Sequence, residues 1–226
     1  MATIMANGLN IAYESHGNPD DPCVLLVMGL GMQLIAWPAD FVEGIVEQGF
    51  RVLRFDNRDS GLSSKMAQGG KPYLPLAYVK NLLGWPLKTS YTLDDMADDA
   101  LGLLTALRIA QAHVIGVSMG GMIAQVMAAR APLQVLSLTS IMSSSGRRGL
   151  PGPTRAARNA LLQRPKRNAS RAELMAHMAA TVRVIGSPAY PVSEKLLYQR
   201  IEAALQRGSC PEGVARQMVA IAASGE

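Results

Sequence analysis

Short apolar runs recur along the first two thirds of the chain, each about as long as a single strand. Residues 24–28 form an uninterrupted apolar run, which is typical of a strand buried on both faces of a parallel sheet. Ahead of this run, the alternating segments 3–5 and 9–15 flank Asn7-Gly8, a pair that predicts a type I′ hairpin. Further apolar runs predict strands at 51–55, 112–117 and 135–142.

Segments with helical periodicity lie between these predicted strands. The clearest covers residues 92–108, where Thr92 is a typical N-cap and four aspartates in the first turns complement the helix dipole. Two further helices are predicted at 41–48 and 119–130. Because strands and helices alternate, the pattern predicts an α/β fold built on a doubly wound, mostly parallel sheet.

The pattern changes after Gly146, where glycine and proline interrupt the chain and only helices are predicted. Ser170 and Glu173 form a capping box at the start of one helix. Ser193 and Pro211 are typical first residues of two more helices. No strand is predicted beyond this point.

The net charge of the chain also changes after Gly146. Residues 1–146 carry −3, whereas residues 147–226 carry +8, mostly as arginine, within a total of +5. We therefore predict two regions, 1–146 and 147–226. A nucleic-acid interface would need aromatic side chains or a reader motif beside these arginines. The second region has only Tyr190 and Tyr198, so no nucleic-acid partner is expected.

Composition narrows the class of protein further. The chain has 226 residues, of which 49% are hydrophobic and 17% charged, which excludes a disordered protein and favours one sizeable core. Glycine and glutamine interrupt the uncharged stretches 22–39 and 109–129, so no membrane association is expected. Residues 1–10 lack a signal-peptide pattern, and we expect a cytoplasmic protein. Cys23 and Cys210 are too few for a disulfide scaffold.

One motif carries chemistry. The residues from Gly116 to Gly120 match G-x-S-x-G, with Ser118 between the predicted strand 112–117 and the predicted helix 119–130. In such an elbow the serine sits on a strained turn, and side chains at the glycines would collide with neighbouring backbone. A turn that merely packs a helix on a strand would explain the glycines but not the serine. We therefore predict that Ser118 is a nucleophile.

An oxyanion hole needs backbone N–H groups near the nucleophile. The predicted strand 24–28 ends in small residues, and the backbone amides of Leu30 and Met119 are the expected donors. The loop from Asp56 to Ser63 is expected to be structural, with Asp56 and Arg58 fixing it through charge-assisted hydrogen bonds.

In order and spacing, the turn at 28–31, the loop at 56–61 and the Ser118 elbow resemble the α/β-hydrolase superfamily. The branch of carboxylesterases and methylesterases typified by the aclacinomycin methylesterases is the most similar. The resemblance covers residues 1–146, whereas 147–226 resemble the helical cap of that family only in position and helix content. Many relatives have His-Gly where this chain has Met28-Gly29, which leaves the backbone donor in place.

The resemblance implies a catalytic triad in the chain order Ser, Asp or Glu, His. No histidine here fits: His16 lies in the hairpin region, His113 in the strand before the elbow, and His177 in a predicted basic helix. Serines, not an acid, follow Met142. In relatives two further strands supply both groups, so we expect these C-terminal strands to be missing from this chain. A second polypeptide or C-terminal fragment would then complete the fold. A truncated chain and a degenerate hydrolase remain alternatives.

The function expected from this resemblance is hydrolysis of a small carboxylic ester through an acyl-enzyme on Ser118. Candidate pocket residues lie at strand ends, although core packing explains each methionine equally well: Met28, Gly29, Met32, Trp37 and Met142. No cofactor is expected, and no metal either, since no His/Cys/Asp cluster has ligand spacing. A C–C bond hydrolase, perhydrolase or acyltransferase would share the nucleophile, and a non-catalytic ligand-binding protein is the alternative from another class.

Overall fold

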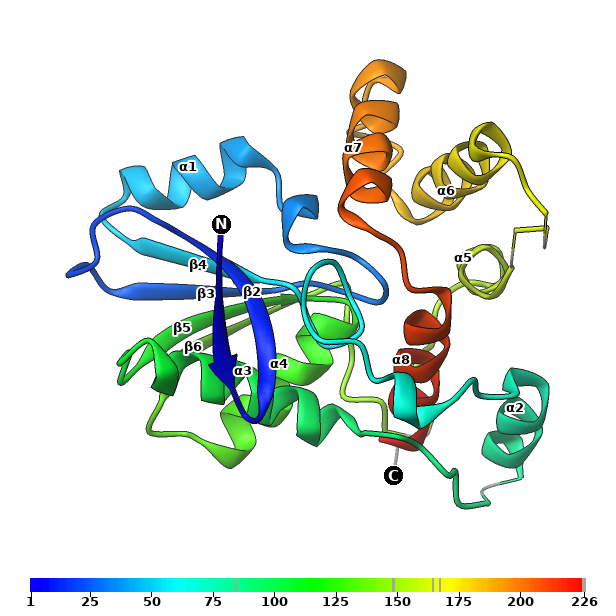
Figure 1. Ribbon diagram of the computed structural model, residues 1–226, viewed down its shortest axis with the longest axis horizontal. Helices are drawn as coiled ribbons and strands as arrows, with labels where there is room; N and C mark the ends of the chain where they lie inside the picture. The colour runs from blue at the N-terminus through cyan, green and yellow to red at the C-terminus, as the bar shows by residue number, and fades with distance from the viewer. Residues whose placement is uncertain (84, 148, 164, 167, 225–226) are drawn as a thin grey trace. The chain divides into compact units, whose positions relative to one another are not determined.

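The computed structural model describes residues 1–83, 85–147, 149–163, 165–166 and 168–224. These residues form two compact units (Figure 1). The sheet unit comprises Met1–Arg148 together with Gly208–Glu226, and the helical unit comprises Gly149–Arg207.

The sheet unit begins with an antiparallel hairpin of β1 (Ala2–Ala6) and β2 (Leu9–His16). Asn7 and Gly8 connect the strands with positive φ angles of 47° and 74°. A type I′ turn requires positive φ at both central residues, so the hairpin predicted from Asn7-Gly8 is confirmed.

The remaining strands form a parallel sheet next to the hairpin. They are β3 (Cys23–Val27), β4 (Arg51–Phe55), β5 (Ala112–Val117) and β6 (Val135–Ile141). The six strands lie in the order β1-β2-β4-β3-β5-β6, and only the pairings of β2 are antiparallel. The doubly wound, mostly parallel sheet predicted from the sequence is confirmed.

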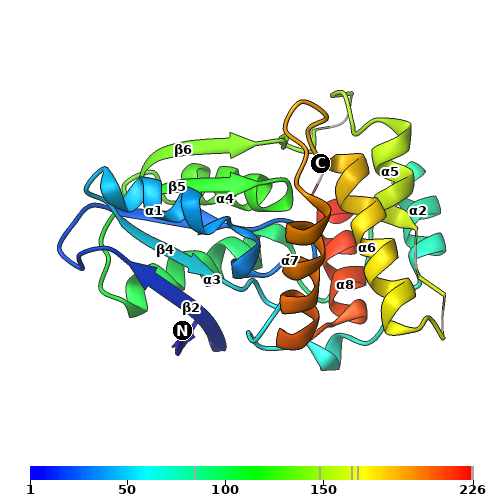
Figure 2. The same cartoon turned by 90° about the horizontal axis from the view of Figure 1, so that it is seen from above.

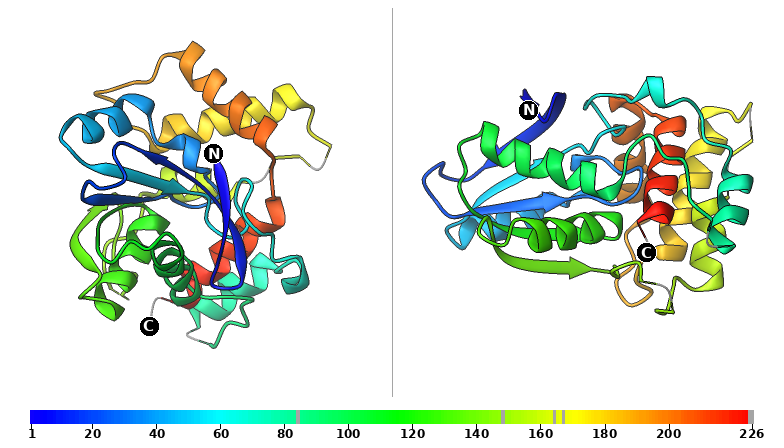
Figure 3. Two further views of the ribbon diagram at one scale, coloured as in Figure 1. Left: turned by 60° about the vertical axis from the view of Figure 1, so that its left-hand side comes forward. Right: turned by 90° about the horizontal axis from the view of Figure 1, so that it is seen from below.

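Helices cover both faces of this sheet (Figures 2 and 3). On one face, α1 (Ala39–Glu47) packs over Val24 and Leu26 of β3. On the other face, α3 (Leu93–Ala106) and α4 (Met119–Arg130) pack over Leu25 and Val27. Both faces of β3 are therefore buried, which explains its uninterrupted apolar run.

The N-terminus of α3 has the predicted cap. The Thr92 side chain accepts a hydrogen bond from the Asp95 backbone N–H, while the Asp95 carboxylate accepts one from the Thr92 N–H. This reciprocal pairing is a capping box.

The last helix, α8 (Pro211–Ala223), belongs to the sheet unit. Ala220 and Ile221 pack into the same core as α3 and α4. The predicted region 147–226 includes this helix, whereas the compact units of the structure assign it to the sheet. The physical reason is that Arg216 and Gln217 are buried and hydrogen-bonded to loops of the sheet unit. The same unit also contains α2 (Leu74–Leu82).

The helical unit consists of α5 (Arg155–Leu162), α6 (Arg171–Ile185) and α7 (Glu194–Arg207). The predicted capping box of Ser170 and Glu173 begins α6. Helices α6 and α7 share a small apolar cluster and are joined by an exposed ion pair between Arg171 and Glu202 at 2.6 Å.

Strand β6 lies at the edge of the sheet and, among the described residues, pairs only with β5. Six of its seven residues are exposed. In the described part of the chain, no helix combines the length and apolar character that crossing a bilayer requires.

Candidate active site

The candidate site lies where the parallel strands end. Four segments follow the carboxyl ends of β3, β4, β5 and β6 and therefore share one edge of the sheet: residues 28–31, residues 56–63, Ser118 and Met142. After β3 the chain forms β4 on one side of that strand and later β5 on the other. Open α/β sheets bind ligands at such a switch in strand order. Ser118 and the 28–31 turn follow the two strands at this switch.

Ser118 occupies a strained turn between β5 and α4. Its φ and ψ angles are 55° and −122°, although it carries a side chain. The Ser118 backbone is held on both sides: its N–H donates to Ile141 O at 2.9 Å, and its carbonyl accepts from Ser143 Oγ at 2.7 Å. Its half-buried side chain makes no cap hydrogen bond to α4. Surrounding structure thus holds a costly conformation in place, as is common at functional sites.

The glycines around Ser118 let α4 approach the sheet. A Cβ on Gly116 would collide with the Gly120 carbonyl, and a Cβ on Gly120 would collide with the Val27 carbonyl. A Cβ on Gly121 would lie 2.6 Å from Ser143 Cβ. The strand–turn–helix geometry that the motif requires is therefore present and depends on the absence of these side chains.

The 28–31 turn lies beside Ser118. A Cβ on Gly29 would be 3.2 Å from Ser118 Cβ and 3.7 Å from its Oγ. In the described part of the chain, the next amide, that of Leu30, makes no hydrogen bond. The amide of Met119 is the first of α4, where backbone donors lack partners within the helix and the helix dipole is positive. Both amides have the chemistry of oxyanion donors.

Side chains from two distant segments hold the 28–31 turn. Asn57 Nδ2 donates to the Met28 carbonyl at 2.9 Å, and the Gly31 N–H donates to Gln217 Oε1 at 2.8 Å. Asp56 accepts from the Leu34 N–H at 2.7 Å. Asp56 also accepts from the Leu62 N–H within its own loop at 2.9 Å, which confirms the structural role expected for it. The sequence predicted no role for Asn57 or Gln217.

Two buried ion pairs hold the 56–63 loop. Arg58 and Asp99 form a bidentate pair, with Nε–Oδ2 at 2.6 Å and Nη2–Oδ1 at 2.7 Å. Arg216 and Asp59 form a second one at 2.8 and 2.7 Å, and the Tyr91 hydroxyl also donates to Asp59 at 2.7 Å.

The electrostatics of Asp59 indicate an ionised anchor rather than a general base. Burial alone would raise the pKa of its carboxyl, but hydrogen bonds from Arg216, Met66 and Tyr91 outweigh burial and hold that pKa below its ordinary value. The pKa of Tyr91 is raised by burial and by its hydrogen bond to Asp59. A carboxylate so fully engaged is poorly placed to accept a proton from Ser118.

The candidate pocket residues fall into two groups. Met28 and Trp37 are 4% and 5% exposed, and the expected oxyanion donor Met119 is 1% exposed. Met28 and Trp37 pack together in the core beneath α1, whereas Met119 lies in the core on the other face. Met32 and Met142 are exposed. Met28, Trp37 and Met119 have the burial of core residues, and contact of Met28 and Trp37 with a substrate stays a prediction.

The histidines lie away from this edge or outside the sheet unit. His16 is paired with Val52, and His113 with Ser137, at the amino end of the parallel strands. His177 lies on α6 of the helical unit. Among the described residues no group of three or more His, Cys, Asp or Glu side chains could hold a metal ion.

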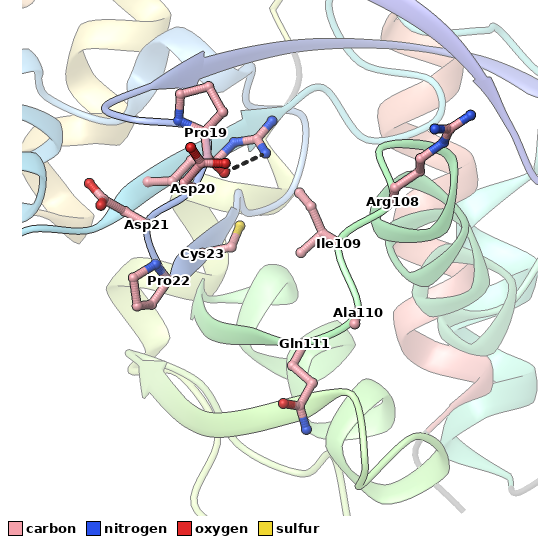
Figure 4. A pocket seen from close by; sticks show the side chains of 10 residues that line it. Pro19, Asp20, Asp21, Pro22, Cys23, Arg108, Ile109, Ala110 and Gln111 are labelled. Carbon is pink, nitrogen blue, oxygen red and sulfur yellow. Dashed lines mark hydrogen bonds between the residues drawn. The ribbon is translucent and has the colours of Figure 1, made fainter.

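Two open hollows occur in the sheet unit, and neither includes Ser118 or the 28–31 turn. The first, of about 350 Å³, lies between residues 19–23 and 108–111 at the amino end of the strands (Figure 4). Burial raises the pKa of the Cys23 thiol, which faces this hollow, to about 11. The second lies between His16 and α1. Both of these hollows lie away from the edge that carries Ser118.

Known proteins are similar to this chain in sequence. Residues 22–181 match the family described as alpha/beta hydrolase fold. Rhodomycin D methylesterase DauP from Streptomyces sp. (strain C5) is 33% identical over 132 residues, which are 58% of this chain and 38% of that protein. Rhodomycin D methylesterase DnrP from Streptomyces peucetius gives the same identity and coverage. The match thus spans 38% of the length of these curated relatives.

Solved structures share the fold at low sequence identity. A variant of the meta-cleavage product hydrolase from Pseudomonas fluorescens IP01 superimposes with a TM-score of 0.69 at 20% identity, over 100% of this chain and 73% of that one. The enol-lactonase from Burkholderia xenovorans LB400 gives a TM-score of 0.62 at 25% identity, over 98% and 74% of the two chains.

Proposed function

Because this chain belongs to the α/β-hydrolase fold family, we propose that it carries the nucleophile of a serine hydrolase that cleaves small carboxylic esters. The observation that carries the proposal is Ser118, held in a strained turn at the head of α4 with the 28–31 turn beside its Oγ. The methylesterase relatives support an ester as the substrate class.

In the proposed reaction, Ser118 Oγ attacks the ester carbonyl carbon while a histidine takes the hydroxyl proton. The carbonyl oxygen becomes an oxyanion and accepts hydrogen bonds from the amides of Leu30 and Met119, each worth about 3 kcal/mol in comparable sites. When the tetrahedral intermediate collapses, the histidine returns its proton to the leaving alcohol. Water then hydrolyses the acyl-Ser118 ester by the same route.

The histidine and its orienting acid are proposed to come from a partner segment, which is either further sequence of the same protein or a second polypeptide. His16 and His113 lie at the opposite end of the strands from Ser118. The exposed backbone edge of β6 is a surface on which another strand can pair. We propose that the partner segment adds to this edge and thereby brings its histidine to Ser118.

The helical unit is proposed to act as the cap that selects substrates by size. Its three helices form a compact unit, in which α6 and α7 share an apolar cluster. Met32 and Met142, which are 39% and 61% exposed, are the proposed apolar contacts for the acyl or alcohol group.

A fluorophosphonate probe tests for an activated serine. We expect the complete protein to be labelled at Ser118 and a Ser118→Ala variant to be unlabelled and inactive on p-nitrophenyl esters. The matched control is Ser145→Ala, because Ser145 is an exposed serine on the loop after β6. This variant should keep both labelling and turnover. Absence of labelling in the complete protein would favour a ligand-binding role, and full turnover by Ser118→Ala would refute the site.

Denaturing mass spectrometry of the active preparation tests the partner segment. We expect a second species, or a chain heavier than the 24.1 kDa of these 226 residues. Full esterase turnover from the 24.1 kDa species alone would contradict this part of the proposal.

A further inference from the structure

We propose that Gln217 is a positioning residue for ester hydrolysis, because its side-chain amide fixes the 28–31 turn that presents the oxyanion donor. The inference rests on the proposed function of Ser118 and Leu30. The sequence predicted α8 as a helix but gave it no part in the site.

The Gln217 side chain is fully buried and uses both ends of its amide. Its Oε1 accepts from the Gly31 N–H at 2.8 Å. Its Nε2 donates to the Arg58 carbonyl at 2.9 Å and to Ser60 Oγ at 3.1 Å. Only a side chain with an acceptor and a donor at this separation satisfies a backbone N–H and a backbone carbonyl together. Gln217 therefore links the 28–31 turn to the loop after β4.

The Leu30 amide lies between two backbone groups that side chains hold. On one side Asn57 donates to the Met28 carbonyl, and on the other Gln217 accepts from the Gly31 N–H. The peptide group that contains the Leu30 N–H is flanked by the two peptide groups so held. Fixing both neighbours limits rotation of the Leu30 N–H about the flanking dihedral angles.

Helix α8 is itself fixed against the turn and the neighbouring loop. Gly31 has a φ of 67°, and a Cβ at that position would lie 2.8 Å from Val214 Cγ2, so the helix packs directly on the turn. The adjacent residue, Arg216, pairs with Asp59 and also donates to the Gly70 carbonyl at 2.7 Å. The ion pair anchors the helix, and the helix holds the Gln217 amide at the turn.

A misplaced donor weakens binding of the transition state more than binding of the ester, because charge develops on the oxygen only during the reaction. A displacement of about 1 Å in an active site can cost roughly 100-fold in rate. We expect Gln217→Met, which lacks both polar groups at similar length, to lower kcat by roughly 10- to 100-fold while KM changes by less than about threefold. Gln217→Glu keeps the acceptor but places an oxygen against the Arg58 carbonyl. We expect its kcat to fall as well.

The matched control is Ser224→Ala at the opposite end of α8. Ser224 Oγ accepts from the Leu93 N–H at 3.4 Å, so this change loosens the helix from α3 without touching the 28–31 turn. It should leave kcat and KM close to those of the wild type. A general loss of α8 packing would affect the control as well.

The experiment compares the wild type, both Gln217 variants and Ser224→Ala in the complete protein. It measures kcat and KM on a p-nitrophenyl ester, inhibition by a trifluoromethyl ketone that forms a tetrahedral adduct with Ser118, and hydrogen exchange of the peptide spanning 28–33. We expect only the Gln217 variants to lose inhibitor affinity in proportion to kcat and to exchange the Gly31 amide faster. A merely structural role would lower stability in urea without changing the ratio of inhibitor affinity to KM.

The outcomes separate the two proposals. An inactive, unlabelled wild type contradicts the proposed function, and the exchange measurement then still tests whether Gln217 holds the turn. An active wild type whose kcat and Gly31 exchange are unchanged in Gln217→Met overturns the positioning role. Should Gln217→Met fail to fold, Gln217→Glu carries the same comparison.

Discussion

Replacing Arg216 by methionine removes a guanidinium from a buried ion pair while keeping an unbranched side chain. The Arg216 and Asp59 side chains are 4% and 0% exposed, and two hydrogen bonds of 2.8 and 2.7 Å join them. After the replacement, Asp59 keeps hydrogen bonds from Tyr91 and Met66 but loses its counter-charge. Removing one partner of a buried pair costs about 3–5 kcal/mol, and we expect the free energy of unfolding to fall by that amount.

The structure offers a matched control in Arg130→Met. Arg130 pairs with Asp98 at 3.0 Å and with Asp94 at 3.4 Å, and all three side chains are more than 40% exposed. Exposed pairs contribute about 0–1 kcal/mol, so this variant should unfold close to the wild type in urea titrations followed by circular dichroism. A double variant of Asp59→Asn with Arg216→Met should show a coupling energy of about 1–3 kcal/mol.

The same pair predicts a pH dependence of defined sign. The pKa of Asp59 in the folded protein lies below its ordinary value, because the hydrogen bonds from Arg216, Met66 and Tyr91 outweigh burial. Such a group stabilises the fold above its unfolded pKa, and the stabilisation is lost as the pH falls through the folded pKa. Because both proteins have the same unfolded state, the stability difference between wild type and Arg216→Met should shrink as the pH falls toward and through the lowered pKa of Asp59 in the wild type. Equal urea midpoints for the two arginine variants would refute the reasoning, as would a difference that persists in acid.

Three further predictions concern single residues. Gly29→Ala puts a Cβ 3.2 Å from Ser118 Cβ, so kcat for ester hydrolysis should fall about tenfold or more, and an unchanged kcat would contradict the crowding. Because burial raises the Cys23 pKa to about 11, iodoacetamide at about pH 8 should modify Cys23 only after unfolding in urea, as read by peptide mass spectrometry. Thr92→Ala removes the α3 capping box and should cost about 1 kcal/mol in urea titrations, whereas Thr92→Ser should keep most of that stability.

The elements of the sheet unit were predictable because their signals are local. The hairpin at Asn7-Gly8, the runs at 51–55 and 112–117, and the helix after Thr92 each depend on neighbours a few residues apart. The turn that carries Ser118 also has a local signal, since its glycines and Ser118 all lie within residues 116–120. Local steric requirements determine such segments before any long-range contact forms.

The surroundings of the elbow were not predictable in the same way. A methionine at the end of a strand has the same local sequence whether it lines a pocket or fills a core. Met28 and Met119 are buried because α1 covers one face of the sheet and α3 with α4 the other. Their burial follows from how the sheet is covered, which periodicity does not specify.

The position of α8 in the sheet unit depends on tertiary contacts rather than on local sequence. By composition, Arg216 is one arginine among many in a basic region, and Gln217 beside it carries no motif. Their partners Asp59 and Gly31 lie 157 and 186 residues earlier in the chain. The strands, the helices at 41–48, 92–108 and 119–130, and the serine turn follow from local sequence, because backbone sterics and apolar periodicity act over short distances. Only folding brings α8 against the 28–31 turn, since buried charges and amides are stable only where distant groups complete their hydrogen bonds.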